Sequence, residues 1–240
     1  DQSHPVGDAV GQLRNPAAPP RVVVTGWQIY DNKGRVVEKY EPFFSEGWDY
    51  AAPTDAQRGQ KITNYYDPRG QQIRTIFPNQ SEQIIVQGVP TNLNDPLTYE
   101  PTPWKAYTYD PNDNAGRTHA AASTAYQTHW NTPTSVKVDA LGRTIETIQH
   151  KGANQATEWY QTVSTYDIRG NLLTVTDPMN RLAFEHVYDL LDNALRIQNL
   201  DAGVRRRILD AAGNLIERRD SKSALILNSY DNLNRPIRKW

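Results

Sequence analysis

The 240-residue chain contains no cysteine, which excludes disulfides, thiolate nucleophiles and thiolate metal sites. It is also poor in large apolar residues, because Leu, Ile, Val and Phe together make up 49 of its 240 residues, close to the composition of disordered chains. Its net charge of −1, however, lacks the self-repulsion that keeps polar chains open. We therefore expect a folded chain in which the 13 Tyr and 6 Trp supply much of the buried area.

Long apolar runs are absent as well. No window reaches the roughly 18 to 20 apolar residues that a membrane-spanning helix needs, and the first ten residues, DQSHPVGDAV, lack the basic and apolar regions of a signal peptide. The near-zero net charge gives no electrostatic reason to expect nucleic acid. We therefore expect no membrane span and no nucleic-acid partner.

Tyrosine and aspartate form a repeat along the chain. Six of the 13 tyrosines directly precede an aspartate, whereas chance predicts about one, and these pairs are Tyr30-Asp31, Tyr66-Asp67, Tyr109-Asp110, Tyr166-Asp167, Tyr188-Asp189 and Tyr230-Asp231. Two further sites keep the aspartate after another strand-compatible residue, at Val138-Asp139 and Leu209-Asp210. The spacings between the eight aspartates are 36, 43, 29, 28, 22, 21 and 21 residues. A period that converges on 21 is typical of a repeat architecture.

Each repeat contains a predicted turn. The aspartate ends a strand and accepts hydrogen bonds from backbone N–H groups, and a residue with positive φ follows three positions later. Glycine is best suited to that position and asparagine is next best. The residues concerned are Asp31 with Gly34, Asp67 with Gly70, Asp139 with Gly142, Asp167 with Gly170, Asp210 with Gly213 and Asp231 with Asn234.

A predicted core contact follows each turn. Six residues after the aspartate, an aliphatic side chain stands in seven of the eight repeats: Val37, Ile73, Ile145, Leu173, Leu195, Ile216 and Ile237. A second polar turn begins ten residues after the aspartate in the tight repeats, at Asp177, Asn199 and Asp220, which leaves about six strand residues, or ~20 Å, between turns. The sequence therefore predicts an all-β fold, a curved antiparallel sheet of repeated short hairpins.

Helix is the competing interpretation of the C-terminal part, since AAGNLIERRDSKSALIL could carry a short helical period. The regularly placed Gly170, Gly203 and Gly213 would break such a helix. We therefore expect strands from residue 136 to residue 240.

Four segments follow from this pattern. Residues 1–20, with four prolines, are expected to be a linker or the tail of an upstream region, and residues 21–78 to hold irregular repeats. Residues 79–135 break the period and are expected to be a loop-rich insertion, either a lateral elaboration or a docking site for a partner. Residues 136–240 hold the tight repeats and end in mid-repeat, from which we expect a longer polypeptide and an open strand edge.

The motifs YDNKGRVV, YDPRGQQI, VDALGRTI, YDIRGNLL and LDAAGNLI resemble the Rhs or YD-repeat superfamily. Over residues 21–240, longer stretches such as WQIYDNKGRVVEKYEPFF and TYDIRGNLLTVTDPMNR are similar to the Rhs-repeat region of the B subunit of bacterial insecticidal toxin complexes. The resemblance implies a sheet that spirals into a hollow shell around a cytotoxic polypeptide. It also implies as partners the remaining Rhs repeats of the same or another chain, and a pore-forming subunit reached through regions outside this sequence. The expected localisation is secreted and bacterial.

The sequence offers no catalytic, metal or cofactor site that we would assign. The self-cleaving DPxGL-type motif of the family is not matched by DPRGQ or DPMNR, which lie in register as repeat turns. A calcium loop at PNDNAGRTHAA would lack its closing Glu. The five histidines, His4, His119, His129, His150 and His186, have no HExxH spacing, and no serine lies in a G-x-S-x-G elbow.

Two surface features leave alternatives open. Residues 181–240 carry eleven positive against eight negative charges, and strand alternation would place Arg205 and Arg207 on one face and Arg206 on the other. We expect these arginines to be solvated or paired with neighbouring carboxylates rather than to form a binding patch. The Tyr of each pair is expected to pack in an aromatic ladder. The favoured function is a non-enzymatic shell segment, and the alternatives are a teneurin-like adhesion module and a carbohydrate-binding sheet.

Overall fold

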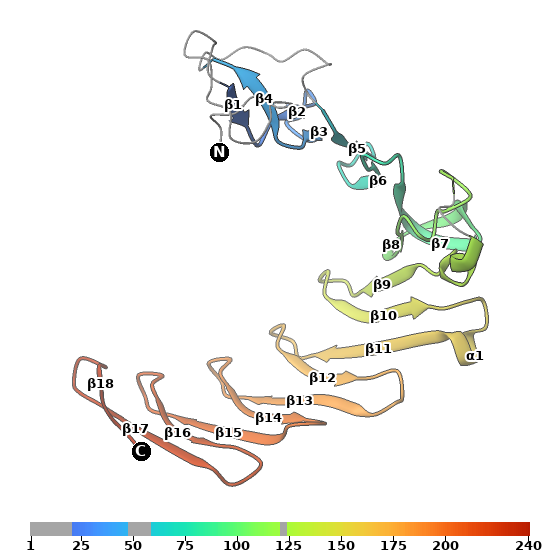
Figure 1. Cartoon of the computed structure of the whole chain (residues 1–240). Helices are drawn as coiled ribbons and strands as arrows, with labels where there is room; N and C mark the ends of the chain where they lie inside the picture. Colours follow the sequence, from blue (N-terminus) through green and yellow to red (C-terminus); the bar gives the residue numbers. More distant parts are fainter. Residues whose placement is uncertain (1–20, 48–58, 121–123) are drawn as a thin grey trace. The chain divides into compact units, whose positions relative to one another are not determined.

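The computed structural model describes residues 21–47, 59–120 and 124–240, and within these ranges the regular secondary structure is almost entirely β-strand (Figure 1). The all-β antiparallel prediction is confirmed, and the alternative of a helix near the C-terminus is wrong. No helix among the described residues has the length and apolar character needed to cross a lipid bilayer. The predicted linker at residues 1–20 lies outside the described ranges.

The chain divides into two compact units. Unit 1 comprises the described residues up to Tyr99 together with Thr108–Asn131, and unit 2 comprises Glu100–Tyr107 and Thr132–Trp240. In unit 1, a separate two-stranded sheet pairs β1 (Arg21–Val24) with β4 (Phe43–Glu46). The remaining strands of unit 1 are neighbours in chain order: β2 (Gln28–Tyr30), β3 (Val36–Tyr40), β5 (Lys61–Tyr66), β6 (Gln72–Ile76), β7 (Glu82–Asn92) and the ends of β8 (Asp95–Tyr109).

In unit 2, every strand lies beside the strands that precede and follow it in the chain (Figure 1). The strands are β9 (Thr134–Val138), β10 (Thr144–His150), β11 (Trp159–Tyr166), β12 (Leu172–Thr176), β13 (Leu182–Tyr188), β14 (Ala194–Asn199), β15 (Gly203–Leu209), β16 (Leu215–Arg219), β17 (Leu225–Tyr230) and β18 (Pro236–Lys239). A single helical turn, α1 (Gln155–Glu158), interrupts the connection between β10 and β11. Sequential antiparallel pairing of this kind needs only short hairpin connections.

A β-bulge accompanies the seven turns that begin at the repeat aspartates Asp31, Asp67, Asp139, Asp167, Asp189, Asp210 and Asp231. In the β11–β12 hairpin, Tyr166 lies opposite Leu172 but Thr165 lies opposite Thr174, so Leu173 is the extra residue. The other extra residues are Val37, Ile73, Ile145, Leu195, Ile216 and Ile237. The aliphatic position six residues after each of these aspartates is therefore the bulge residue, which has no partner on the opposite strand.

None of these seven aliphatic side chains is fully buried, in contrast to the expected core contact. Six are half-buried, and Ile237 is 59% exposed. The main contacts of each strand are with its sequential neighbours, so its side chains are covered mostly by residues on the same face. Full burial of large apolar side chains in the described ranges is confined to Tyr40, Phe43, Val86, Tyr107, Tyr109 and Ile148.

The expected loop-rich insertion at residues 79–135 is largely strand in its first half. β7 and β8 are the two longest strands and hold Pro90, Pro96, Pro101 and Pro103 within them. Proline lacks a backbone N–H and is tolerated where no ladder partner is needed. β7 and β8 are far longer than their neighbours β6 and β9, so parts of each have no outer neighbour and can accept proline. Irregular backbone begins only after Tyr109, followed by the 3-10 helix η1 (Thr124–His129).

Candidate functional site

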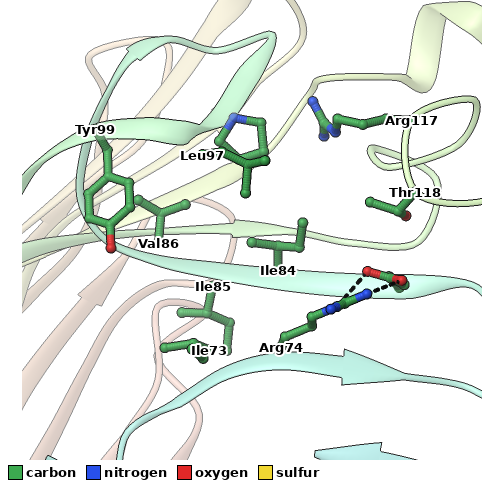
Figure 2. Close-up of a pocket in the computed structure, with 11 residues that line it drawn as sticks. Ile73, Arg74, Ile84, Ile85, Val86, Leu97, Tyr99, Arg117 and Thr118 are labelled. Atoms are coloured by element: carbon green, nitrogen blue, oxygen red, sulfur yellow. Dashed lines mark hydrogen bonds and ion pairs between the residues drawn. The ribbon is translucent and has the colours of Figure 1, made fainter. Parts of the chain in front are cut away.

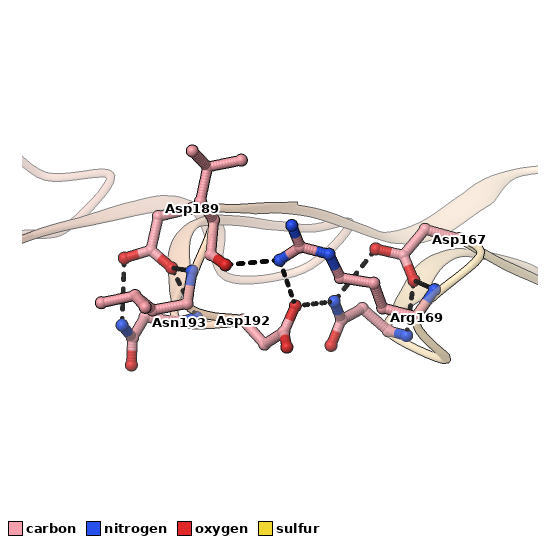
Figure 3. Close-up of polar contacts among 8 residues, drawn as sticks. Asp167, Arg169, Asp189, Asp192 and Asn193 are labelled. Carbon is pink, nitrogen blue, oxygen red and sulfur yellow. Dashed lines mark hydrogen bonds and ion pairs between the residues drawn. The ribbon is translucent and has the colours of Figure 1, made fainter.

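The most regular feature of the molecule is the Asp turn, which is well defined between β11 and β12. The backbone N–H of Asp167 donates to the Asn171 carbonyl at 3.0 Å, and that of Gly170 donates to the Asp167 carbonyl at 3.2 Å. Oδ1 of Asp167 accepts hydrogen bonds from the backbone N–H groups of Arg169 and Asn171 at 2.9 Å. Oδ2 accepts from the Asn171 side chain at 3.0 Å (Figure 3). One carboxylate thus satisfies three donors and fixes the turn.

The same pattern recurs at the other repeats, with the exception of Asp110, which begins an irregular loop. The third residue after the aspartate has positive φ, with values of 77° at Gly34, 89° at Gly70, 76° at Gly142, 100° at Gly170, 84° at Gly213 and 59° at Asn234. After Asp189 this position is Asp192, at 65°, a residue that the glycine pattern did not single out. The second turns follow the same rule, with Asn180 and Ser223 at positive φ after Asp177 and Asp220.

The turn is closed by the residue four positions after the aspartate, which was not predicted from the sequence. Its side chain donates to Oδ2 of the aspartate, and it is Arg35, Arg143, Asn171, Arg181, Asn193, Asn214 or Arg235. Gln71, after Asp67, and Ala224, after Asp220, contribute their backbone N–H alone. The sequence does show this position, since Arg, Asn or Gln stands four residues after the aspartate of each YD turn. Such residues are common in polar turns, however, so the regularity did not stand out.

These hydrogen bonds lower the pKa of the turn aspartates. A hydrogen bond from the residue four positions later makes the largest contribution, from the side chain at Asp139, Asp167, Asp177, Asp189 and Asp210 and from the backbone N–H at Asp31 and Asp231. Donors that bind the charged form favour it, so the pKa falls below its usual value. The turns are therefore held by ionised carboxylates.

Neighbouring turns are joined side by side. Arg169 donates to the Leu190 carbonyl at 2.5 Å and to Oδ1 of Asp192 at 3.1 Å, and the Asn171 side chain donates to the same Asp192 oxygen at 2.7 Å (Figure 3). Arg143 reaches the Asp167 carbonyl at 2.8 Å. The row of turns at one end of the strands is therefore a continuous hydrogen-bonded band in this part of unit 2.

The tyrosine of the repeat forms a second link between hairpins. The Tyr166 hydroxyl donates to the Thr144 carbonyl at 2.9 Å, five residues past the preceding Asp139. The same offset holds for Tyr66 to Val36, Tyr188 to Leu172 and Tyr230 to Leu215. The Arg143 guanidinium also lies 5.0 Å from the Tyr166 ring centre, a cation–π distance. Four of the six repeat tyrosines thus bond to the preceding repeat, whereas the Tyr30 hydroxyl donates to Gln28 of its own strand. In the part of the chain that the structure describes, stacking along one strand is found for Phe184, His186 and Tyr188.

Unit 1 contains an apolar pocket of about 410 Å³ between β6, β7 and β8. Ile73, Ile84 and Val86 line it, and Leu97, 75% exposed, lies at its rim (Figure 2). Arg74 binds both carboxylate oxygens of Glu82, at 2.7 and 2.5 Å. Arg117, on the other side, donates to the Asn94 and Asp113 carbonyls and stacks on Tyr109. The polar groups at this pocket are thus largely engaged with the protein itself.

Unit 2 contains a buried histidine. His150 is 3% exposed, its Nε2 lies 3.0 Å from the Ser135 hydroxyl, and its ring lies 5.5 Å from Tyr107 and 4.5 Å from Trp159. Burial, with a smaller contribution from Lys105, lowers the pKa of His150 to about 4. Among the described residues, no group bonds to Nδ1 of His150, so the pair lacks the orienting third group of a nucleophilic triad. We interpret it as a packing element.

The residues considered for calcium are engaged in the loop after β8. Oδ1 of Asp110 accepts from the backbone N–H groups of Asn112 and Asp113, and the buried Asn114 side chain donates to three carbonyls. Across the described ranges, no group of three acidic, histidine or cysteine side chains is placed to hold a metal ion.

No family model and no curated protein matches the chain. Solved toxin-complex structures do. The TcdB2–TccC3 complex without its hypervariable C-terminal region is 26% identical over 91% of this chain, with a TM-score of 0.72. The Tc holotoxin pore of Photorhabdus luminescens, with a mutated TccC3, is 25% identical over 92%, with a TM-score of 0.75. This chain spans about a tenth of the chains it matches, 10% in both cases.

These matches confirm the resemblance to the Rhs-repeat region of toxin complexes that the YD motifs predicted. The similarity extends over nearly the whole chain, so the chain has the fold of a structural part of such a complex, a β-shell segment.

Proposed function

We propose that this chain is a non-enzymatic wall segment of an Rhs-repeat shell, which encloses a cytotoxic polypeptide and keeps it from acting before delivery. The likeness to the TcdB2–TccC3 complex over 91% of the chain supports this proposal most directly. In this proposal the protein is secreted by a bacterium, and the neighbours of the segment are further Rhs repeats. A pore-forming subunit is reached through regions outside these 240 residues.

The physical basis for a barrier is continuous strand pairing. Neighbouring strands of a sheet lie about 4.8 Å apart, which is too narrow for a polypeptide to pass between them. The strand ends would be the weak places of such a wall, because hairpin turns fray easily. In this chain the Asp turns are closed by carboxylates, and Arg169 and Asn171 tie one turn to the next.

Imaging of the natural full-length polypeptide that carries these repeats tests the proposal. We expect electron microscopy to show a closed hollow particle with the sheet as its wall and density for a polypeptide inside. A solid or open particle would contradict enclosure.

Protease protection provides a second test with matched variants. We expect the enclosed segment to resist trypsin in the native protein and in Arg206→Ala, which changes an exposed side chain without an ion pair among the described residues. Leu173→Asp should open the wall and allow cleavage, since it places an unpaired charge at a half-buried bulge. Equal cleavage in all three proteins would argue that nothing is enclosed.

A further inference from the structure

Three arginines lie together on one face of the sheet in unit 2. Arg207 on β15 lies directly opposite Arg218 on β16, so both side chains project from the same face. Arg205 lies two residues before Arg207 and projects from that face as well. All three are exposed. We call these three residues the arginine patch.

The arginine patch has no counter-charge in the described structure. None of its three members makes an ion pair with a described residue, whereas Arg196 pairs with Glu185 and Arg219 with Glu217 on the opposite face. Of the two expectations for these arginines, exposure to solvent is found, and pairing with neighbouring carboxylates is not found in the described ranges.

The flanking strands supply no acid to this face either. Ile197 of β14 lies opposite Arg205, and Ile226 of β17 lies opposite Arg218. Like charges directly across a strand pair destabilise a sheet. The Arg207–Arg218 pair therefore lowers the stability of the free sheet, and an anion bound between the two guanidinium groups would relieve the repulsion.

We propose that the arginine patch binds a short acidic segment of a polypeptide, with Arg207 and Arg218 sharing a carboxylate. A carboxylate matches the forked donors of a guanidinium, and two opposed arginines can grip one from both sides. The inference goes beyond the proposed function, because it holds whether or not the sheet encloses anything.

The surroundings favour a polypeptide over nucleic acid. The patch is bounded along its strands by turn carboxylates, Asp201 before β15 and Asp210 after it, with Asp220 following β16. A long polyanion running along the strands would meet this negative charge within about 20 Å. Ile197 and Ile226, directly beside the arginines, are aliphatic and give no aromatic platform within the patch itself. The stacked rings of Phe184, His186 and Tyr188 lie on the same face but on β13, two strands away from β15.

Fluorescence anisotropy of the 240-residue chain tests the proposal. The probes are labelled hexaglutamate, hexaglutamine, hexalysine and a six-nucleotide thymidine strand. We expect only hexaglutamate to bind well, with an affinity that falls as sodium chloride rises. Absence of hexaglutamate binding, or tighter binding of the thymidine strand, would overturn the proposal.

Two charge-matched double variants identify the surface. Arg207→Gln with Arg218→Gln should weaken hexaglutamate binding by about tenfold, since two exposed charge contacts are lost. Arg206→Gln with Arg238→Gln removes the same charge from the opposite face and should leave the affinity within about twofold. If both double variants weakened hexaglutamate binding equally, net charge alone would explain the binding, and the proposal of a specific patch would be overturned.

The melting temperature distinguishes a binding role of the arginines from a stabilising role, because the two roles predict opposite changes when the arginines are replaced. The Arg207→Gln, Arg218→Gln protein should melt at a higher temperature than the native chain, and hexaglutamate should raise the melting temperature of the native chain only. A lower melting temperature for this variant would show that the arginines stabilise the sheet and would contradict the inferred repulsion.

Discussion

At the scale of single residues, the Asp turn depends on one backbone angle. Gly170 has a φ of 100°, and no atom outside its chain neighbours lies within 4 Å of the place where a side chain would begin. Glycine is therefore required there because of the backbone angle, and not because a larger side chain would clash with a neighbour.

Gly170→Val should lower the free energy of unfolding by about 1 to 3 kcal/mol, because a β-branched residue resists positive φ. Gly170→Asn is the matched control and should be much less costly, since Asn180 and Asn234 already occupy this turn position at positive φ. Chemical denaturation of both variants would measure the difference. Equal stabilities for Val and Asn would contradict the backbone explanation.

The tyrosine hydroxyl is a second residue-scale determinant. Tyr166→Phe should lower the free energy of unfolding by about 0.5 to 1.5 kcal/mol, because the hydrogen bond to the Thr144 carbonyl is lost. Tyr160→Phe provides the comparison, since Tyr160 is 44% exposed and its hydroxyl has no hydrogen bond to a described residue. If the two variants lost similar stability, the loss would come from removing any tyrosine hydroxyl and not from breaking the link between repeats.

At the scale of the hairpin, the repeated aliphatic residue is the extra residue of a bulge. Leu173 and Ile237 hold equivalent places in their hairpins, but Leu173 is half-buried between β11 and β13 whereas Ile237 is 59% exposed. The offset alone does not determine the burial, because burial depends on strands on both sides.

Leu173→Asp should therefore lower the free energy of unfolding by about 1 to 3 kcal/mol through loss of apolar contact and partial burial of a charge. Ile237→Asp at the same offset should change it by no more than about 0.5 kcal/mol. Denaturant titration of the two variants measures both free energies of unfolding. Comparable losses would show that stability depends on the bulge position itself and not on burial by the neighbouring strands.

The sequence was informative where chemistry is local. The Asp and Gly offsets of the turn could be predicted, because the φ requirement and the carboxylate acceptors act within five residues. The bulge at Leu173 could not, since the register of β12 against β11 is a property of two strands. The strands containing Pro90 and Pro101 were missed for the same reason, because proline is tolerated only where a neighbouring strand is absent.

Arg205, Arg207 and Arg218 illustrate the same limit. Alternation along one strand placed Arg205 and Arg207 on a common face, but only the pairing of β15 with β16 brings Arg218 opposite Arg207. The sequence separation of eleven residues carries no sign of this, because it depends on the turn and bulge between the strands.

At the scale of the whole molecule, stability should depend on pH through His150. The pKa of this histidine is lowered from 6.5 to about 4 in the folded protein, so below pH 6.5 the unfolded chain takes up a proton that the folded chain does not. Stability is therefore complete above pH 6.5 and falls as the pH drops toward 4, by up to about 3 kcal/mol.

His150→Gln should remove this dependence while keeping a hydrogen-bonding partner for Ser135. Free energies of unfolding measured between pH 7 and pH 4 should converge for the two proteins as the pH falls. A parallel decline would assign the pH effect to other groups. Below pH 3.8 both proteins should lose further stability, since the turn aspartates have lowered pKa values and must be protonated.

The links from Tyr166, Tyr188 and Tyr230 to the preceding hairpins allow whole hairpins to be removed from the sheet of unit 2. Removal of residues 189–209 would join Tyr188 directly to Asp210 and recreate an intact Tyr-Asp pair. The excised segment contains the Asp189 turn with its bulge, the Asn199 turn and strands β14 and β15. Tyr188 would keep its partner on Leu172 and Tyr230 its partner on Leu215. A protein built in this way can gain or lose length by whole hairpins through gene duplication or deletion, and the new contact is confined to the two strands that meet at the junction, here β13 and β16.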